Sequence, residues 1–373
     1  MSSSQDTSTS LVQAVDTSLS SLSSSLTTLS SLTSSHSLLT SSSSSTSLPP
    51  FPPGLCDIFR QLLQSLQQTI TSLALSFKSP ITPDAAIQQI HKLSDQTAQL
   101  VSCILASGTM GLSILVDDWI DGMVNVIQEE HHLIQGLRLT AIRVDVQGKD
   151  EKGSQEMYLN TGKVWDAIDG LLKLPLTEVE AVVRRWKIHG ELVKDAWTEF
   201  CESLEVEEDG EQEEEFEEDE EWAELDALGG KKYSQEDRET ALAIKPILSL
   251  HHILHSSIPQ RLPLLSSDPE QTYRSILQAS GKFLDAFDTV IAALYPDQSP
   301  REIDDAVRNL EKSSKAILTI LRERLAIQVV DESMTEKREV FGGSLDKWEK
   351  RFNHETERWN GRSLNLSALA AAL

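Results

Sequence analysis

Apolar residues recur at intervals of three and four along most of the chain, which is the spacing of an amphipathic α-helix. The clearest stripe consists of Leu55, Ile58, Phe59, Leu62, Leu63, Leu66, Ile70 and Leu73. Almost no run alternates apolar and polar residues for long enough to predict a β-strand. The pattern therefore predicts an all-α protein.

Capping residues mark where the predicted helices begin. Thr82-Pro83, Asp268-Pro269 and Ser299-Pro300 each place a capping residue before a proline, which is favoured in the first turn of a helix. Thr177 and Glu180 form a capping box, in which each side chain can bond a backbone amide of the first turn. Other helices are expected over 109–144 and 154–174, from 234 with a kink at Pro246, and from 335.

The N-terminal segment, residues 1–54, has a low-complexity sequence in which thirty of the first fifty residues are Ser or Thr. Its leucines nevertheless follow the helical period, at Leu19, Leu22, Leu26, Leu29 and Leu32. Because Ser and Thr hydroxyls compete for the backbone, we expect a marginal amphipathic helix near 8–34 that is ordered only if it docks on the rest of the chain. A flexible linker would follow over 35–54. Disorder throughout the segment is the alternative.

An acidic run divides the chain. Residues 205–226 contain fifteen Asp or Glu and no Lys or Arg, which accounts for more than half of the net charge of −25. The sequence therefore predicts two antiparallel helix bundles joined by an acidic connector. The expected regions are 1–54 for the Ser/Thr-rich segment, 55–204 for the first bundle, 205–230 for the connector, 231–360 for the second bundle and 361–373 for a tail.

Composition also excludes several classes of partner and location. No cluster of Lys and Arg is present to neutralise phosphates, so direct nucleic-acid binding and docking on anionic lipid are disfavoured. No apolar run approaches the ~20 residues that cross a bilayer. The first basic residue is Arg60, so residues 1–59 cannot supply the basic region of a secretory signal. The three cysteines lack the spacing of a zinc site or disulfide framework. We expect a protein of the cytosol, the nucleus or both.

One motif raises the possibility of an enzyme. Asp117, Asp118 and Asp121 match the DDxxD pattern with which helical prenyl and terpene synthases hold Mg²⁺ and diphosphate, and oxygen ligands suit a hard cation. That chemistry needs a second acidic motif on a facing helix, and the pair Asp304-Asp305 lacks the spacing. We interpret the aspartates as the solvated face of an amphipathic helix and keep a divergent Mg²⁺-dependent diphosphate enzyme as an alternative.

A histidine cluster is the other candidate for chemistry. His251 and His255 stand one helical turn apart, but His252 occupies the place where an HExxH zinc hydrolase has its glutamate. We therefore predict that these histidines lie on the polar face of a helix. The run Glu129–His132 is interpreted in the same way. Because no phosphate-binding loop or nucleophile motif occurs either, we expect no catalytic centre, metal or cofactor.

Two stretches resemble a known family. The first, Tyr158–Asp169, contains Gly162 and Trp165, and Pro175 follows ten residues after the tryptophan; the second, Val193–Glu199, reads Val-Lys-Asp-Ala-Trp-Thr-Glu. In order and spacing the chain resembles the cyclin-D-binding protein (GCIP) family over roughly residues 55–330. The resemblance implies an all-helical regulator that binds D-type cyclins and helix-loop-helix transcription factors and restrains cell-cycle progression. The Ser-rich N-terminus and the residues after Pro175 depart from that pattern.

The partner-binding residues are predicted from their charge and, in the acidic run, from their aromatic rings. We expect Gly162 and Trp165 to pack the first bundle, and charged residues near them to recognise the partner. The acidic run would bind a basic segment of a partner, with its aromatic residues as anchors. The alternative is that the acidic run is a solvated loop. The predicted residues are Asp166, Asp169, Lys194, Asp195, Phe216 and Trp222. The sequence thus favours a non-catalytic, protein-binding regulator, with a helical scaffold or cytoskeletal adaptor of the vinculin type as an alternative.

Overall fold

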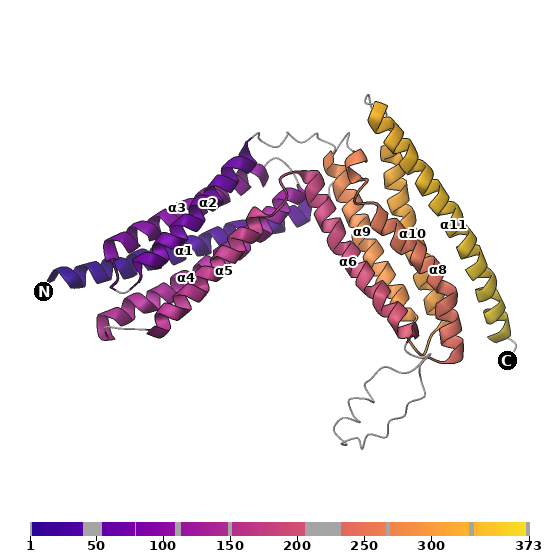
Figure 1. The fold of residues 1–373 in the computed structure, drawn as a ribbon, viewed down its shortest axis with the longest axis horizontal. Helices are drawn as coiled ribbons and strands as arrows, with labels where there is room; N and C mark the ends of the chain where they lie inside the picture. The colour runs from indigo at the N-terminus through magenta and orange to yellow at the C-terminus, as the bar shows by residue number, and fades with distance from the viewer. Residues whose placement is uncertain are drawn as a thin grey trace, which may run out of the picture. The chain divides into compact units, whose positions relative to one another are not determined.

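The computed structural model describes residues 2–39, 54–78, 80–108, 113–147, 151–205, 233–265, 269–327 and 332–370. Its elements are labelled in Figure 1. In chain order they are α1 (Ser2–Leu39), α2 (Leu55–Ser76), α3 (Pro83–Gly108), α4 (Ile114–Gln147), α5 (Glu151–Leu172), α6 (Glu178–Glu205), α8 (Gln235–Ser257), the 3₁₀ helix η1 (Leu262–Leu265), α9 (Pro269–Ala293), α10 (Pro300–Leu325) and α11 (Glu332–Ala370).

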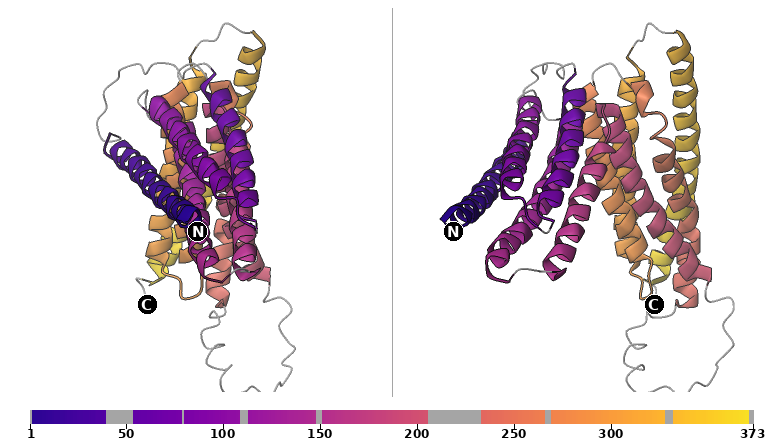
Figure 2. Two further views of the ribbon diagram at one scale, coloured as in Figure 1. Left: turned by 90° about the vertical axis from the view of Figure 1, so that its left-hand side faces the viewer. Right: turned by 60° about the vertical axis from the view of Figure 1, so that its left-hand side comes forward.

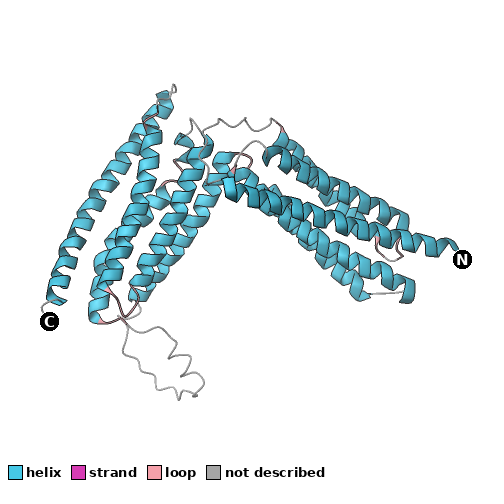
Figure 3. Cartoon of the chain, turned by 180° about the vertical axis from the view of Figure 1, so that it is seen from behind, coloured by secondary structure: helices cyan, strands magenta, loops and turns pink. Residues whose placement is uncertain are grey.

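The prediction of an all-α fold is confirmed. Across the described ranges every regular element is a helix, and Figures 2 and 3 show only helices and the loops between them. None of these helices contains a stretch long and apolar enough to pass through a lipid bilayer.

The predicted caps explain several helix starts. The helices α3, α9 and α10 begin at the three prolines expected in first turns. The Ser234 hydroxyl accepts a hydrogen bond from the Asp237 amide at 3.0 Å, and the Thr177 hydroxyl accepts one from the Glu180 amide at 3.3 Å. The expected continuous helix from 109 is wrong, because Ser113 is not helical and α4 begins at Ile114.

The chain divides into two compact units, Met1–Ala181 and Val182–Leu373. This division lies earlier than the boundary near residue 204 that the acidic run suggests. The reason is that α6 packs with the second unit: the Trp186 indole donates to the carbonyl of His255 at 2.9 Å, and Arg238 donates to the carbonyl of Leu204 at 3.1 Å. In sequence the acidic run therefore falls inside the second unit, between α6 and α8, and most of it lies outside the described residues.

The first unit is a ring of five helices. Helix α1 packs against α3 and α4, α2 packs against α3 and α5, and α4 packs against α5, so each helix has two main neighbours (Figure 1). The contact between α4 and α5 is so close that a Cβ atom on Gly122 would come within 2.6 Å of Leu171. The predicted marginal helix near 8–34 is present as the longer α1, docked through Leu11, Val15, Leu22 and Leu29, which are buried.

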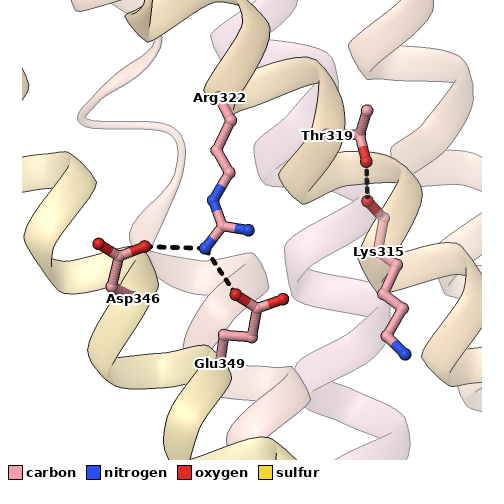
Figure 4. A network of polar contacts seen from close by, with 5 residues as sticks. All are labelled: Lys315, Thr319, Arg322, Asp346 and Glu349. Atoms are coloured by element: carbon pink, nitrogen blue, oxygen red, sulfur yellow. Dashed lines mark hydrogen bonds and ion pairs between the residues drawn. The ribbon is translucent and has the colours of Figure 1, made fainter.

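The second unit is built around aromatic side chains. Its fully buried residues include Trp186, Tyr273, Phe283, Phe287, Phe341 and Phe352. Helix α9 packs against α10, and α11 lies along α8 and α10. Arg322 on α10 bonds both Asp346 and Glu349 on α11, at 2.8 and 2.6 Å, and so ties the last helix to the bundle (Figure 4).

Candidate functional site

The outward side of α5 carries an exposed aromatic surface. Tyr158 is 49% exposed, Leu159 is 62% exposed and Trp165 is 38% exposed. We call the residues Tyr158, Leu159, Gly162, Trp165, Asp166 and Asp169 the α5 outer face. Tyr158 and Trp165 are the two aromatic residues among the exposed large hydrophobic side chains of the described ranges.

The helical period explains why these residues face outward. Met157, Thr161, Val164 and Ile168 form the buried stripe of α5 and already fill its core-facing side. The α5 outer face lies beside and opposite this stripe, because its residues are offset from the centre of the stripe by about a fifth to a half of a turn. Its edge adjoins α2, since the Gln67 side chain donates to Asp169 at 3.1 Å.

The interpretation of Gly162 and Trp165 as core residues is wrong. Trp165 is partly exposed, and an added Cβ on Gly162 would meet no atom within 4 Å. The stripe that fills the core is made by aliphatic residues and Thr161, so neither family-motif residue is needed there. The space that a side chain at Gly162 would enter, on the same side of α5 as Tyr158 and Trp165, is open.

The structure places the predicted site residues in different regions. Asp166 and Asp169 are exposed on α5 in the first unit, whereas Lys194 and Asp195 are exposed on α6 in the second unit. Lys194 forms an ion pair with Glu191 at 3.7 Å. The remaining two, Phe216 and Trp222, lie outside the described residues.

Sequence reasoning missed the apolar members of the exposed surface. The family pattern contains Tyr158 and Leu159 but does not indicate that they are exposed. Helix α6 exposes a further apolar pair, Ile188 and Leu192, at a spacing of four. The available signal was periodicity: Tyr158, Gly162 and Trp165 share one side of the helix, away from the stripe through Val164.

The three aspartates of the DDxxD motif do not converge. Asp118 is buried, Asp117 is half-buried and Asp121 is exposed, so the predicted solvated face is wrong for Asp118. The Glu178 carboxylate covers the N-terminus of α4, where it accepts from the amides of Ile114 and Leu115 at 2.8 and 3.1 Å. An anion is favoured at that position, and the protein's own side chain already occupies it.

No other described cluster forms a metal site. Within the described ranges, no three His, Cys, Asp or Glu side chains are arranged so that they could hold a metal ion.

The prediction that the histidines of α8 lie on a polar face is wrong for two of them. His251 and His255 are both buried. His255 lies between Trp186 and Phe283, with ring centroids 4.6 and 4.9 Å away. His252 is only half-buried and stacks against Trp197. The aromatic surroundings explain the burial, because a neutral imidazole can pack like an aromatic ring.

A serine hydroxyl from another helix pairs with one nitrogen of each ring, whereas His251 Nε2 and His255 Nδ1 are buried and have no hydrogen-bond partner among the described residues. His251 Nδ1 lies 2.7 Å from the hydroxyl of Ser314 on α10, and His255 Nε2 lies 2.8 Å from that of Ser280 on α9. Burial lowers the pKa of His251 to about 3. Burial, together with charge on His189 and His252, lowers the pKa of His255 to about 3. Ser280 is fully buried, so this Ser–His pair stabilises the core and offers no surface to a substrate.

The first unit buries an acid. Glu130 on α4 is fully buried and accepts a hydrogen bond from the Thr97 hydroxyl on α3 at 3.0 Å. Burial raises the pKa of the Glu130 carboxyl to about 8, although the hydrogen bond from Thr97 acts in the opposite direction. The predicted polar face is therefore wrong for Glu130 as well.

The fold and this surface define an all-α bundle protein with an exposed aromatic face. Residues 58–206 match the family model described as Grap2 and cyclin-D-interacting, N-terminal. The resemblance to the GCIP family that the sequence shows is therefore confirmed over this segment. A comparison with curated proteins finds no match. The matched segment runs from α2 to the end of α6 and contains the whole α5 outer face, whereas α1 lies outside it.

Proposed function

We propose that the protein is a non-catalytic regulator that binds another protein through the α5 outer face. The observation that carries the proposal is the exposure of Tyr158 and Trp165 within the family-matched segment. Tryptophan and tyrosine dominate the binding energy of protein interfaces, because a large ring buries much apolar area at a small loss of conformational entropy. Leu159 extends the apolar area, and Asp166 and Asp169 form a charged rim.

The description of the matching family as cyclin-D-interacting supports a D-type cyclin as the partner. The family resemblance adds helix-loop-helix transcription factors as partners, a restraining role in the cell cycle, and action in cytoplasm and nucleus. The acidic run adds a second, less specific contact. Its fifteen carboxylates attract a basic segment of the partner, and Phe216 and Trp222 supply apolar anchors.

The test is a binding titration of the full chain with a purified D-type cyclin. Trp165→Ala combined with Tyr158→Ala should weaken binding at least about thirtyfold, because loss of two hot-spot rings costs roughly 2 kcal/mol or more. Leu75→Ala on α2 is the control, since it likewise removes a large exposed apolar side chain. Leu75 is 62% exposed, and it does not lie on α5. Circular dichroism checks that both variants keep their helices.

The outcomes separate the surface from the partner. If the cyclin binds and the double variant binds equally well, the α5 outer face is not the binding surface. If the native chain fails to bind any D-type cyclin, the proposed partner is wrong.

A further inference from the structure

Helix α1 fills a groove between two other helices. It packs extensively against both α3 and α4, and these two helices contact each other much less than each contacts α1. Without α1 the other four helices of the first unit would still be joined through α2 and α5, but the facing sides of α3 and α4 would be uncovered. The groove is therefore a built site whose present occupant shows what it accepts.

The occupant is an amphipathic helix with a narrow apolar seam. The seam consists of Leu11, Val15, Ser18, Leu22 and Leu29, all buried and spaced by three, four or seven residues. At its centre the Ser18 and Ser94 hydroxyls lie 2.9 Å apart, which joins α1 to α3. At its edge Arg138 on α4 bonds Asp16 at 2.6 Å. The groove thus recognises apolar residues, a small hydroxyl and one acid.

The chemistry that holds α1 in place is weak. Of its eleven exposed residues with described side chains, nine are Ser or Thr, which are poorer helix formers than Ala. Several of these hydroxyls bond their own helix: Thr17, Ser23 and Thr27 each donate to the carbonyl four residues earlier at 2.9 Å. Such bonds slightly destabilise and bend a helix. The pair between Arg138 and Asp16 is about half exposed and therefore adds little.

The groove and its occupant also differ in their relation to the family model. Both walls, α3 and α4, lie inside the family-matched segment, but α1 lies outside it. We propose that the groove between α3 and α4 binds an amphipathic helix of a partner protein and that α1 is its intramolecular competitor. The partner helix carries apolar residues at the spacing of the α1 seam, a small residue opposite Ser94 and an acid opposite Arg138. A helix with fewer Ser and Thr residues than α1 would displace it.

This proposal shares with the proposed function only the idea that the partner is a protein. It uses a different surface, so its test neither involves the α5 outer face nor requires a cyclin. Failure here would leave the cyclin titration unaffected.

The test locks α1 in place within the full chain. Ser18→Cys and Ser94→Cys place two thiols where the hydroxyls are 2.9 Å apart, close enough for a disulfide. The background carries Cys56→Ser, Cys103→Ser and Cys201→Ser. The probe is a fluorescent peptide of residues 8–34 with Ser20→Ala, Ser24→Ala and Thr27→Ala, which raise its helix propensity without changing the seam. Mass spectrometry verifies the disulfide.

We expect the reduced chain to bind the peptide saturably and the oxidised chain to bind it at least about tenfold more weakly. In the unlocked chain Arg138→Glu should leave binding of this peptide nearly unchanged, because α1 and the peptide carry the same Asp16 and lose the same ion pair. A peptide that also carries Asp16→Arg should bind the Arg138→Glu chain about two- to fivefold more tightly than the parent peptide does, as for an exposed ion pair. The single variant Ser18→Cys is the control for redox conditions and should bind the same under both.

Four results would overturn the proposal. They are failure of the two cysteines to pair, absence of saturable peptide binding to the reduced chain, and equal binding by the oxidised and reduced chains. The fourth is a dimer of the reduced chain that oxidation dissolves, in analytical ultracentrifugation, because the groove would then accept a second copy of α1 rather than a partner.

Discussion

The first and last helices of the chain each complete a bundle, but different side chains hold them. Helix α1 contributes aliphatic residues and Ser18 to the first unit, with one exposed ion pair at its edge. Helix α11 contributes Phe341, Leu345, Trp348, Phe352 and Trp359 to the second unit. The Trp348 indole donates to the carbonyl of Leu250 at 2.6 Å, and the Trp359 indole donates to Asp304 at 3.1 Å.

The difference teaches what makes a helix replaceable. An aliphatic seam is satisfied by any helix with the same spacing, because dispersion and burial have no direction. An indole N–H has one direction and one partner, so each buried tryptophan fixes the register of α11. Arg322 adds two carboxylate partners on α11 (Figure 4). Helix α11 is therefore an integral part of its bundle, whereas α1 is an exchangeable part.

The largest expected effect comes from removing one of these indoles. Trp348→Ala should destabilise the second unit by about 3–5 kcal/mol, because it opens a cavity beside His251 and Phe352 and leaves the Leu250 carbonyl without its donor. Urea denaturation monitored by hydrogen exchange measures the loss. As the counterpart on α1, Leu22→Ala should speed exchange in α1 and leave the exchange of α2 and α5 nearly unchanged. A loss below about 1 kcal/mol for Trp348→Ala would remove the contrast between the two helices.

The two units also differ in the ionisable groups that they bury. Among the groups whose pKa burial shifts strongly, the acid Glu130 lies in the first unit and the bases His251 and His255 lie in the second. Each group is neutral when folded, because burial disfavours its charged form. An acid and a base held neutral respond to pH with opposite signs, so the two units should lose stability at opposite ends of the pH scale.

Glu130→Gln tests the first half of that contrast. The folded pKa of about 8 lies above the ordinary value of 4.5, so the group's stabilising contribution is complete below pH 4.5 and is lost as pH rises toward 8. Between pH 5 and 7 the loss should be about 3 kcal/mol. In Glu130→Gln this part of the pH dependence should be absent. The free energy of unfolding of the variant, relative to that of the native chain, should therefore increase over the same pH range. A constant difference between the two proteins would mean that Glu130 is charged in the folded state.

The sequence predicted what depends on neighbours along the chain. The starts of α3, α9 and α10 follow from a capping residue and a proline, both local signals. The burial of His251 could not be predicted, because its hydrogen-bond partner Ser314 lies 63 residues away on another helix. The assignment of α6 to the second unit has the same cause: an apolar stripe says that a helix is buried, but not against which helices.

At the candidate site, residue type alone predicted the position of the charged residues correctly and that of the tryptophan wrongly. Asp166 and Asp169 were placed correctly on an exposed side of a helix, since charged residues are rarely buried. Trp165 was assigned to the core because large aromatic residues usually lie there. The aliphatic stripe through Val164 and Ile168 had already filled that side of α5, and only the helical period, not the residue type, carried this information.

His251→Gln gives the smallest of the three effects and tests the second half of the pH contrast. The folded pKa of about 3 lies below the ordinary value of 6.5, so the stabilising contribution of the neutral imidazole is complete above pH 6.5 and is lost as pH falls toward 3. Between pH 6.5 and 5 this loss should be about 2 kcal/mol. The groups that face the ring are the Ser314 hydroxyl and the rings of Phe283, Trp348 and Phe352, and none of these can take up the proton. Urea denaturation of the second unit at the two pH values should therefore show a weaker pH dependence in His251→Gln than in the native chain, while the first unit responds alike in both proteins. If the stability of the second unit depends on pH equally in the two proteins, His251 is protonated without unfolding. The two units would then not differ in pH dependence as their buried groups predict.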